Sequence, residues 1–292
     1  MDTFVGYCSV ELADELSGVT FPMVVFYPTF TPEKIERLGP YSVNVAKDAE
    51  PREGVFPLIL ISHGSGGSHL VYRTLAHHLA RNGFIVGMPE HPFNNRNNNT
   101  LEGTVENLIN RPRHIHIAID WFYDNWNYAR LLKPDSVAII GHSMGGYTAL
   151  ALAGGVPTSL PNESSDGRPR QISIIPDYRV KSLVLLAPAV PWFREEGSLT
   201  GVNVPILMLV GEKDEFSPYV FLAQLIQERV TDKTKIQYRV VENAGHYSFL
   251  SSFPESMTNV AFPPSQDPCG FNRESFHNEL NAEVLDFLLH NT

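Results

Sequence analysis

An apolar run that stops abruptly at a glycine constrains the fold of this chain most strongly. Val137–Ile140 is typical of a strand buried on both faces, and the helix-forming run Tyr147–Ala153 follows it closely. Between them stands Gly-His-Ser-Met-Gly, in which Gly141 and Gly145 let the backbones pass on either side of Ser143. This order predicts a strand, a strained turn that presents a serine hydroxyl, and a helix. The alternative is a glycine-rich turn whose serine only caps the helix.

Two later segments supply the partners that a reactive serine needs. A serine hydroxyl is a weak nucleophile at neutral pH, so it requires a base and an acid that orients the base. Asp214 follows the predicted strand Val204–Val210, and His246 follows the predicted strand Lys235–Val241. Because the carboxyl ends of parallel strands meet at one edge of a sheet, the order Ser143, Asp214, His246 predicts a catalytic triad.

Each of these partners has a competing interpretation. Glu212 and Glu215 are rival acids, but Asp214 has the usual offset from the end of its strand. Asp214 is also placed to cap a helix that begins near Pro218. The alternative for His246 is a solvated loop histidine, although the glycine before it lets the loop turn inward.

The predicted strand Val55–Ser62 ends in a second segment that bears on the chemistry, His-Gly-Ser-Gly-Gly. Acyl transfer needs backbone N–H donors aimed at the oxygen that becomes negative. In a fold of this kind one donor is the residue after the nucleophile, here Met144. The glycines let the second segment approach the serine, so we expect the other donor to be the N–H of Ser65, with Gly64 or Gly66 as alternatives.

The alternation of strands and helices predicts an α/β fold with a mostly parallel central sheet and helices on both faces. We expect an antiparallel pair of strands, Phe4–Val10 and Phe21–Tyr27, at one edge of the sheet. Residues 31–54 are rich in charge, proline and glycine and predict irregular surface with at most a short helix near 33–38. Residues 104–128 have a helical pattern that we expect Pro112 to interrupt.

The sequence favours one domain over residues 1–292, with insertions near 90–110, 154–177 and 251–272 that form a small cap or line a pocket. Residues 31–54 are a further candidate for the pocket wall. Four aromatic residues suggest an apolar site for an acyl group or a ring, with packing in the core as an equal alternative: Phe93, Trp192, Phe193 and Tyr247.

Charge and cysteine content narrow the range of partners. The formal net charge is -10, which argues against nucleic acid as a partner. No segment approaches 18 apolar residues and the first residues do not resemble an export signal, so we expect a cytoplasmic protein that does not enter a membrane. Cys8 and Cys269 have no metal-type spacing, and His114 and His116 would point to different faces of a helix. We therefore expect no metal site; the oligomeric state stays open.

Two blocks of the sequence resemble the α/β-hydrolase superfamily, and within it the branch of plasma-type platelet-activating-factor acetylhydrolases and dienelactone-hydrolase-like proteins. Pro57–Gly67 and Gly83–His91 are similar to that branch's oxyanion strand and the strand that follows. Gly141–Gly146 is similar to its serine elbow. The resemblance extends over about Tyr27–His246 and implies a serine esterase that needs no cofactor and acts on short acyl groups.

The chain departs from this branch at two positions. The acetylhydrolases carry the triad acid after the strand that follows the elbow, where this chain has Leu186-Ala187-Pro188-Ala189 and no carboxylate. The acid is then Asp214, as in most of the superfamily, and Ser143 replaces the cysteine of true dienelactone hydrolases.

The sequence therefore favours a carboxylesterase for a small-molecule ester with a short acyl group, which works through an acyl-enzyme. An amidase or peptidase, and less strongly a lactonase or thioesterase, would use the same residues. A catalytically silent homologue that only binds a ligand is the alternative from a different class.

Overall fold

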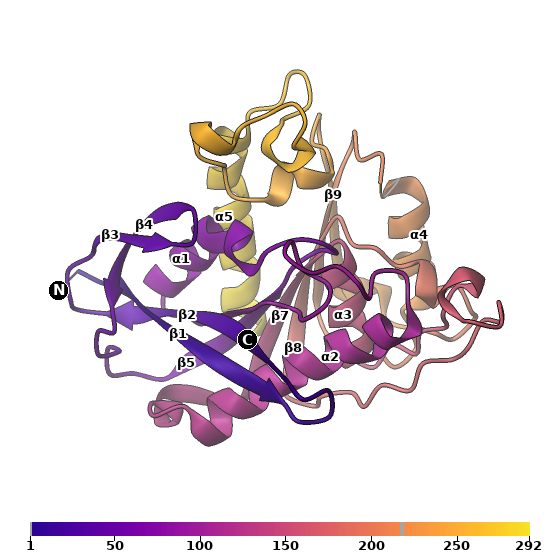
Figure 1. The fold of residues 1–292 in the computed structure, drawn as a ribbon, viewed down its shortest axis with the longest axis horizontal. Helices are drawn as coiled ribbons and strands as arrows, with labels where there is room; N and C mark the ends of the chain where they lie inside the picture. Colours follow the sequence, from indigo (N-terminus) through magenta and orange to yellow (C-terminus); the bar gives the residue numbers. More distant parts are fainter. Residues whose placement is uncertain (1, 217–218) are drawn as a thin grey trace.

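The computed structural model describes residues 2–216 and 219–292, and the strands of this part of the chain form one ten-stranded sheet (Figure 1). Its order is β10-β9-β8-β7-β5-β6-β2-β1-β4-β3. The strands are β1 (Phe4–Asp14), β2 (Val19–Thr29), β3 (Lys34–Leu38), β4 (Tyr41–Lys47), β5 (Phe56–Ser62), β6 (Ile85–Pro89), β7 (Leu132–His142), β8 (Val180–Leu186), β9 (Ile206–Gly211) and β10 (Ile236–Val241).

Six neighbouring strands run parallel: β6, β5, β7, β8, β9 and β10. β2 pairs antiparallel with both β6 and β1. A parallel strand buried on both faces must send alternate side chains into two different cores. In β5, Leu58 and Leu60 pack into one core, and Ile59 and Ile61 pack into the other. The predicted, mostly parallel sheet is therefore confirmed.

Helices cover both faces of this sheet, as predicted. The helices are α1 (Arg73–Arg81), α2 (Val105–Asp120), α3 (Met144–Leu152), α4 (Tyr219–Arg229) and α5 (Arg273–Asn291), with short 3-10 turns and one π turn between the elements. Buried residues of α2, α3 and α4 share one core, and those of α1 and α5 share the other. Among the described residues, no helix combines the length and the apolar composition that crossing a membrane requires.

The prediction for residues 31–54 was wrong, because this segment contains the hairpin β3–β4. Apolar residues alternate along β4 at Tyr41, Val43 and Val45, which suits a strand with one face buried. Gly39 and Pro40, two of the residues that suggested irregular surface, occupy the tight turn between the two strands, where Gly39 has a φ of 56°. Because β4 also pairs with β1, the strands β1 and β2 lie inside the sheet and not at its edge.

The prediction that Pro112 interrupts a helix was also wrong, since α2 runs through it without a break. A proline inside a helix has no N–H to donate to the carbonyl four residues earlier. That carbonyl belongs to Leu108, and the hydroxyl of Tyr147 on α3 donates a 2.9 Å hydrogen bond to it. A side chain from the neighbouring helix thus replaces the missing backbone donor.

Candidate active site

Ser143 lies at the turn between β7 and α3 with φ 52° and ψ -120°. A positive φ is strained for a residue with a side chain, so the surrounding structure must hold it. The backbone N–H of Ser143 donates to the carbonyl of Leu186 at 3.0 Å, and its own carbonyl accepts from Gly146 at 2.8 Å and from Ala189 at 2.9 Å. The predicted sequence of strand, strained turn and helix is therefore present.

The two glycines of the turn allow very close backbone contacts. A Cβ at Gly145 would overlap the carbonyl oxygen of Ser62 at the end of β5, and a Cβ at Gly141 would overlap the carbonyl of Gly145. These contacts explain why the motif has glycine two residues before and two residues after the serine. The close approach also brings the end of β5 against the start of α3.

His246 and Asp214 meet at the same edge of the sheet as Ser143. Nδ1 of His246 lies 2.8 Å from Oδ2 of Asp214, and both side chains are buried. The other carboxylate oxygen of Asp214 accepts a 3.0 Å hydrogen bond from the N–H of Phe216. Because a carboxylate only accepts hydrogen bonds, Nδ1 of His246 donates this bond, which in a neutral imidazole leaves the lone pair on Nε2.

The rival acids lie elsewhere. The side chains of Glu212 and Glu215 are exposed, and Glu212 accepts a hydrogen bond from the N–H of Asn243 at 2.8 Å. Of these three acidic residues, Asp214 is the one whose carboxylate contacts His246. The helix that Asp214 was alternatively expected to cap begins next to residues 217–218, which lie outside the described residues.

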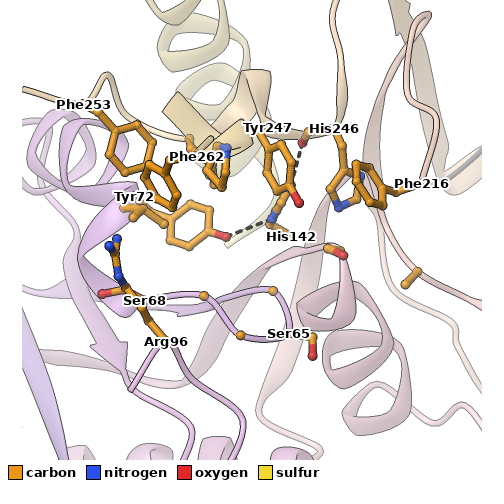
Figure 2. Close-up of a pocket in the computed structure, with 18 of the residues that line it drawn as sticks. Ser65, Ser68, Tyr72, Arg96, His142, Phe216, His246, Tyr247, Phe253 and Phe262 are labelled. Carbon is orange, nitrogen blue, oxygen red and sulfur yellow. Dashed lines mark hydrogen bonds between the residues drawn. The ribbon is translucent and has the colours of Figure 1, made fainter. Parts of the chain in front are cut away.

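Ser143 and His246 line one cavity of about 370 Å³, and the loop at the end of β5 lines it too. Figure 2 shows this cavity with His246 and Phe216 on one side and Phe253, Phe262 and Arg96 on the other. A cavity of this size suits a small molecule. Its other lining residues are Gly64, Ser65, Gly66, Gly67, Ser68, Val71, Tyr72, Glu102, His142, Ala189, Tyr247, Leu250 and Pro264.

Of the four aromatic residues suggested for an apolar site, the cavity lining contains Tyr247. Trp192 and Phe193 pack around Tyr147 in the core instead, with ring centroids 4.9 and 5.7 Å away. Phe93 is likewise not among the described lining residues.

Other aromatic residues line the cavity instead. Phe253 and Phe262 come from the predicted insertion 251–272, and Phe216 comes from the loop after β9. Among the residues that the structure describes, neither 31–54 nor 154–177 contributes to this lining, whereas 90–110 contributes Arg96 and Glu102.

His142, between Gly141 and Ser143, joins the elbow to the loop of His246. Its Nε2 lies 2.9 Å from the carbonyl of His246, which can only accept, so Nε2 donates and Nδ1 accepts from the hydroxyl of Tyr72 at 3.0 Å (Figure 2). Burial lowers the pKa of His142 to about 3, so this ring is neutral at physiological pH. No sequence pattern pointed to His142 or Tyr72, since their contact joins residues far apart in the chain.

The loop after β5 passes directly over the serine. A Cβ built at Gly64 would lie 3.2 Å from the Cβ of Ser143, and Gly66 has a φ of 60°. Gly64, Ser65 and Ser143 line the same cavity. The expected N–H donors, Ser65 with Gly64 or Gly66 as alternatives, therefore belong to a loop in contact with the nucleophile, while Met144 begins α3 directly after it.

Two comparisons with known proteins agree with this architecture. A family model described as the alpha/beta hydrolase fold matches residues 57–199, just under half of the chain, and this segment includes Ser65, Ser143 and Met144. The chain has the α/β-hydrolase fold, as predicted, and the match supports the α/β-hydrolase superfamily.

Among solved structures, the chain is similar to a ferulic acid esterase from Streptomyces cinnamoneus, with a TM-score of 0.72 and 15% sequence identity. The similarity covers 98% of this chain and 89% of the esterase, and at this identity it shows the fold alone. No curated protein matches the sequence. The resemblance to the acetylhydrolase and dienelactone hydrolase branch stays a prediction.

Proposed function

We propose that the protein is a serine hydrolase, and that it is a carboxylesterase for a small ester. One observation carries the proposal: a serine held at positive φ shares a cavity with a buried histidine whose Nδ1 contacts a buried carboxylate. This is the combination that converts a weak hydroxyl into a nucleophile. The hydrolase fold supports the same conclusion.

In the proposed reaction, Oγ of Ser143 attacks the ester carbonyl while Nε2 of His246 takes the hydroxyl proton. The resulting oxyanion accepts hydrogen bonds from the N–H groups of Met144 and Ser65. His246 then gives its proton to the leaving alcohol, and an acyl-enzyme forms. Water, deprotonated by His246, attacks this acyl-enzyme and releases the acid. Asp214 holds the imidazole in the required tautomer throughout.

The cavity supports a small substrate with a flat or apolar part. Its volume of about 370 Å³ accommodates a short acyl group together with a modest alcohol. Aromatic side chains at Tyr72, Phe216, Phe253 and Phe262 give it apolar walls suited to a ring or a short alkyl chain. A similar fold in a ferulic acid esterase is compatible with an aromatic ester, which belongs in the first substrate panel.

The direct test combines active-site labelling with a substrate panel. A fluorophosphonate should label the wild-type protein on the peptide that contains Ser143, and Ser143→Ala should abolish the labelling. p-Nitrophenyl esters of acetate, butyrate and octanoate, together with methyl ferulate, would then define the acyl preference. Labelling that persists in Ser143→Ala, or that maps to another residue, would overturn the assignment of the nucleophile.

The same residues could serve an amidase, because a triad does not by itself choose the leaving group. Turnover on a matched ester and anilide with the same acyl group separates the two activities, and we expect the ester to be preferred. A catalytically silent protein would hydrolyse no member of the panel and would still bind a ligand in the cavity. That result would replace the esterase proposal with a binding function.

A further inference from the structure

Arg111 on α2 is completely buried, and its position in the helix places it on the apolar face. Leu108, three residues before it, and Ile115, four residues after it, are also fully buried. Burial lowers the pKa of Arg111 to about 9, so the guanidinium is still cationic at neutral pH. A buried charge is costly unless its donors are satisfied, so its partners are informative.

The partners of Arg111 are neutral. Its guanidinium donates to Oδ1 of Asn94 at 2.6 Å, to Oγ1 of Thr148 at 3.1 Å, to Oγ of Ser62 at 3.3 Å and to the carbonyl of His63. Within residues 2–216 and 219–292, no carboxylate forms an ion pair with this guanidinium. A structural arginine would ordinarily be neutralised by a carboxylate, and this one is not.

These bonds reach both segments that supply the expected oxyanion donors. On one side, the carbonyl of His63 immediately precedes the loop that contains Ser65. Because an arginine only donates, it fixes the amide of Asn94 so that Nδ2 donates to Oγ of Ser65 at 2.9 Å. That hydroxyl in turn donates to Glu102 at 3.1 Å. The loop is thus held through its backbone and through a serine side chain.

On the other side, Arg111 reaches the start of α3. Oγ1 of Thr148 accepts from Nε of Arg111 and donates to the carbonyl of Met144 at 3.1 Å. Met144 is the residue whose N–H is expected to be the other oxyanion donor. One guanidinium therefore connects the two arms of the proposed oxyanion hole.

We propose that Arg111 is a positioning residue of the proposed esterase: it sets the distance between the loop of Ser65 and the start of α3, and its buried positive charge favours the oxyanion. The inference depends on the proposed function, because it concerns the transition state of ester cleavage. Fixed donors and charges in a site that excludes water stabilise developing negative charge more than the neutral ester. Loss of Arg111 should therefore lower kcat and leave KM nearly unchanged.

Arg111→Lys keeps the charge but loses the planar set of donors, and Arg113→Lys is its matched control. Arg113 lies on the same helix and forms an ion pair with Asp14 at 2.6 Å, with no hydrogen bond or ion pair to the loop or to α3 among the described residues. For Arg111→Lys we expect a fall in kcat on the order of 10- to 100-fold with KM within about threefold, since a small misplacement of donors has effects of this size. Arg113→Lys should stay within about twofold of the wild type.

A second measurement separates positioning from general damage to the fold. An arylboronic acid forms a tetrahedral adduct with a reactive serine and imitates the oxyanion, whereas the acid product of the substrate binds as a ground-state ligand. In Arg111→Lys the boronate Kd should rise by the same factor by which kcat falls, with the Kd of the acid product unchanged. Equal weakening of both ligands would indicate a merely structural role and would overturn the inference.

Asn94→Ala is the second variant, for the case that Arg111→Lys does not fold. This change removes the hydrogen-bonded link from Arg111 to Ser65 and leaves the guanidinium in place. Near-UV circular dichroism identifies the folded variants. Wild-type kcat and boronate affinity in a folded Arg111→Lys, or in Asn94→Ala if the lysine variant is unfolded, would refute the positioning role. If the wild type itself hydrolyses no ester and takes up no boronate, the proposed function fails first, so the two failures are distinguishable.

Discussion

The imidazole of His246 and the carboxylate of Asp214 form a buried contact of 2.8 Å between Nδ1 and Oδ2. In a neutral imidazole this contact leaves the lone pair on Nε2, the nitrogen that acts as the base in the proposed reaction. In Asp214→Asn an amide N–H can face Nδ1, which favours the opposite tautomer and removes the base. We expect kcat for ester hydrolysis to fall on the order of 1,000- to 10,000-fold, while KM stays within a few-fold. Steady-state kinetics on p-nitrophenyl acetate measure both constants.

Glu212→Gln and Glu215→Gln are the matched controls for this change, because both carboxylates belong to the same loop and are exposed. They should retain turnover within about threefold, since exposed charges contribute little to a buried site. A larger loss in either control than in Asp214→Asn would move the triad acid away from Asp214.

Gly145→Ala should prevent the turn at Ser143 from forming, because the new Cβ would overlap the carbonyl oxygen of Ser62. We expect a loss of several kcal/mol in the free energy of unfolding, or no folded protein, since neither backbone can move without disturbing the sheet. Gly18→Ala is the comparison: Gly18 has a φ of 68° but no atom within 4 Å of the added Cβ. It should cost only about 1 kcal/mol, from backbone strain. Urea unfolding curves give both values, and equal costs would contradict the steric explanation.

The sequence was sufficient to predict the parts of the site that depend on local pattern. β9 and the second half of β7 are short apolar runs, and β7, β9 and β10 all end in loops with glycine or charge, so Ser143, Asp214 and His246 could be assigned to one edge of the sheet. The glycines of the elbow indicated close backbone contacts, which the structure contains. These inferences needed no knowledge of which distant residues touch.

The residues that sequence reasoning missed are defined by distant contacts. Phe253 and Phe262 reach the cavity from an irregular segment without periodicity, so no pattern placed them there. Arg111 did leave a signal, because an arginine between Leu108 and Ile115 interrupts an apolar stripe at helical spacing. That signal shows a buried charge but does not identify its partners, since Asn94 and Thr148 come from other elements.

Tyr147→Phe should destabilise the protein although its ring stays in place. The lost hydroxyl leaves the carbonyl of Leu108 without the donor that replaces the missing N–H of Pro112. An unsatisfied buried acceptor costs about 1 to 3 kcal/mol in the free energy of unfolding. In a Pro112→Ala background the helix regains its own N–H, so Tyr147→Phe should cost less there. A double-mutant cycle by urea unfolding measures the difference, and equal costs in both backgrounds would refute the compensation.

Acid should weaken the fold through buried neutral histidines, and His277 on α5 is one that lies outside the proposed triad. Burial lowers the pKa of His277 to about 4, and its Nε2 lies 3.1 Å from the carbonyl of Ser248, to which it donates. An unfolded histidine has a pKa of about 6.5, so between about pH 6.5 and pH 4 the unfolded chain binds up to one proton more than the folded protein. The lowered pKa therefore costs no stability above about pH 6.5, and its cost grows as the pH falls toward 4.

His277→Gln keeps a donor for Ser248 and removes this titration. Each histidine of this kind changes the free energy of unfolding by about 1.4 kcal/mol per pH unit, so the advantage of the wild type over His277→Gln should shrink by about 2 kcal/mol between pH 7 and pH 5. His290→Gln, at an exposed position of the same helix, should give a curve parallel to the wild type. Urea unfolding at half-unit steps of pH measures the three curves. If the curve of His277→Gln also runs parallel to the wild type, burial of a neutral imidazole at this position does not contribute to acid sensitivity.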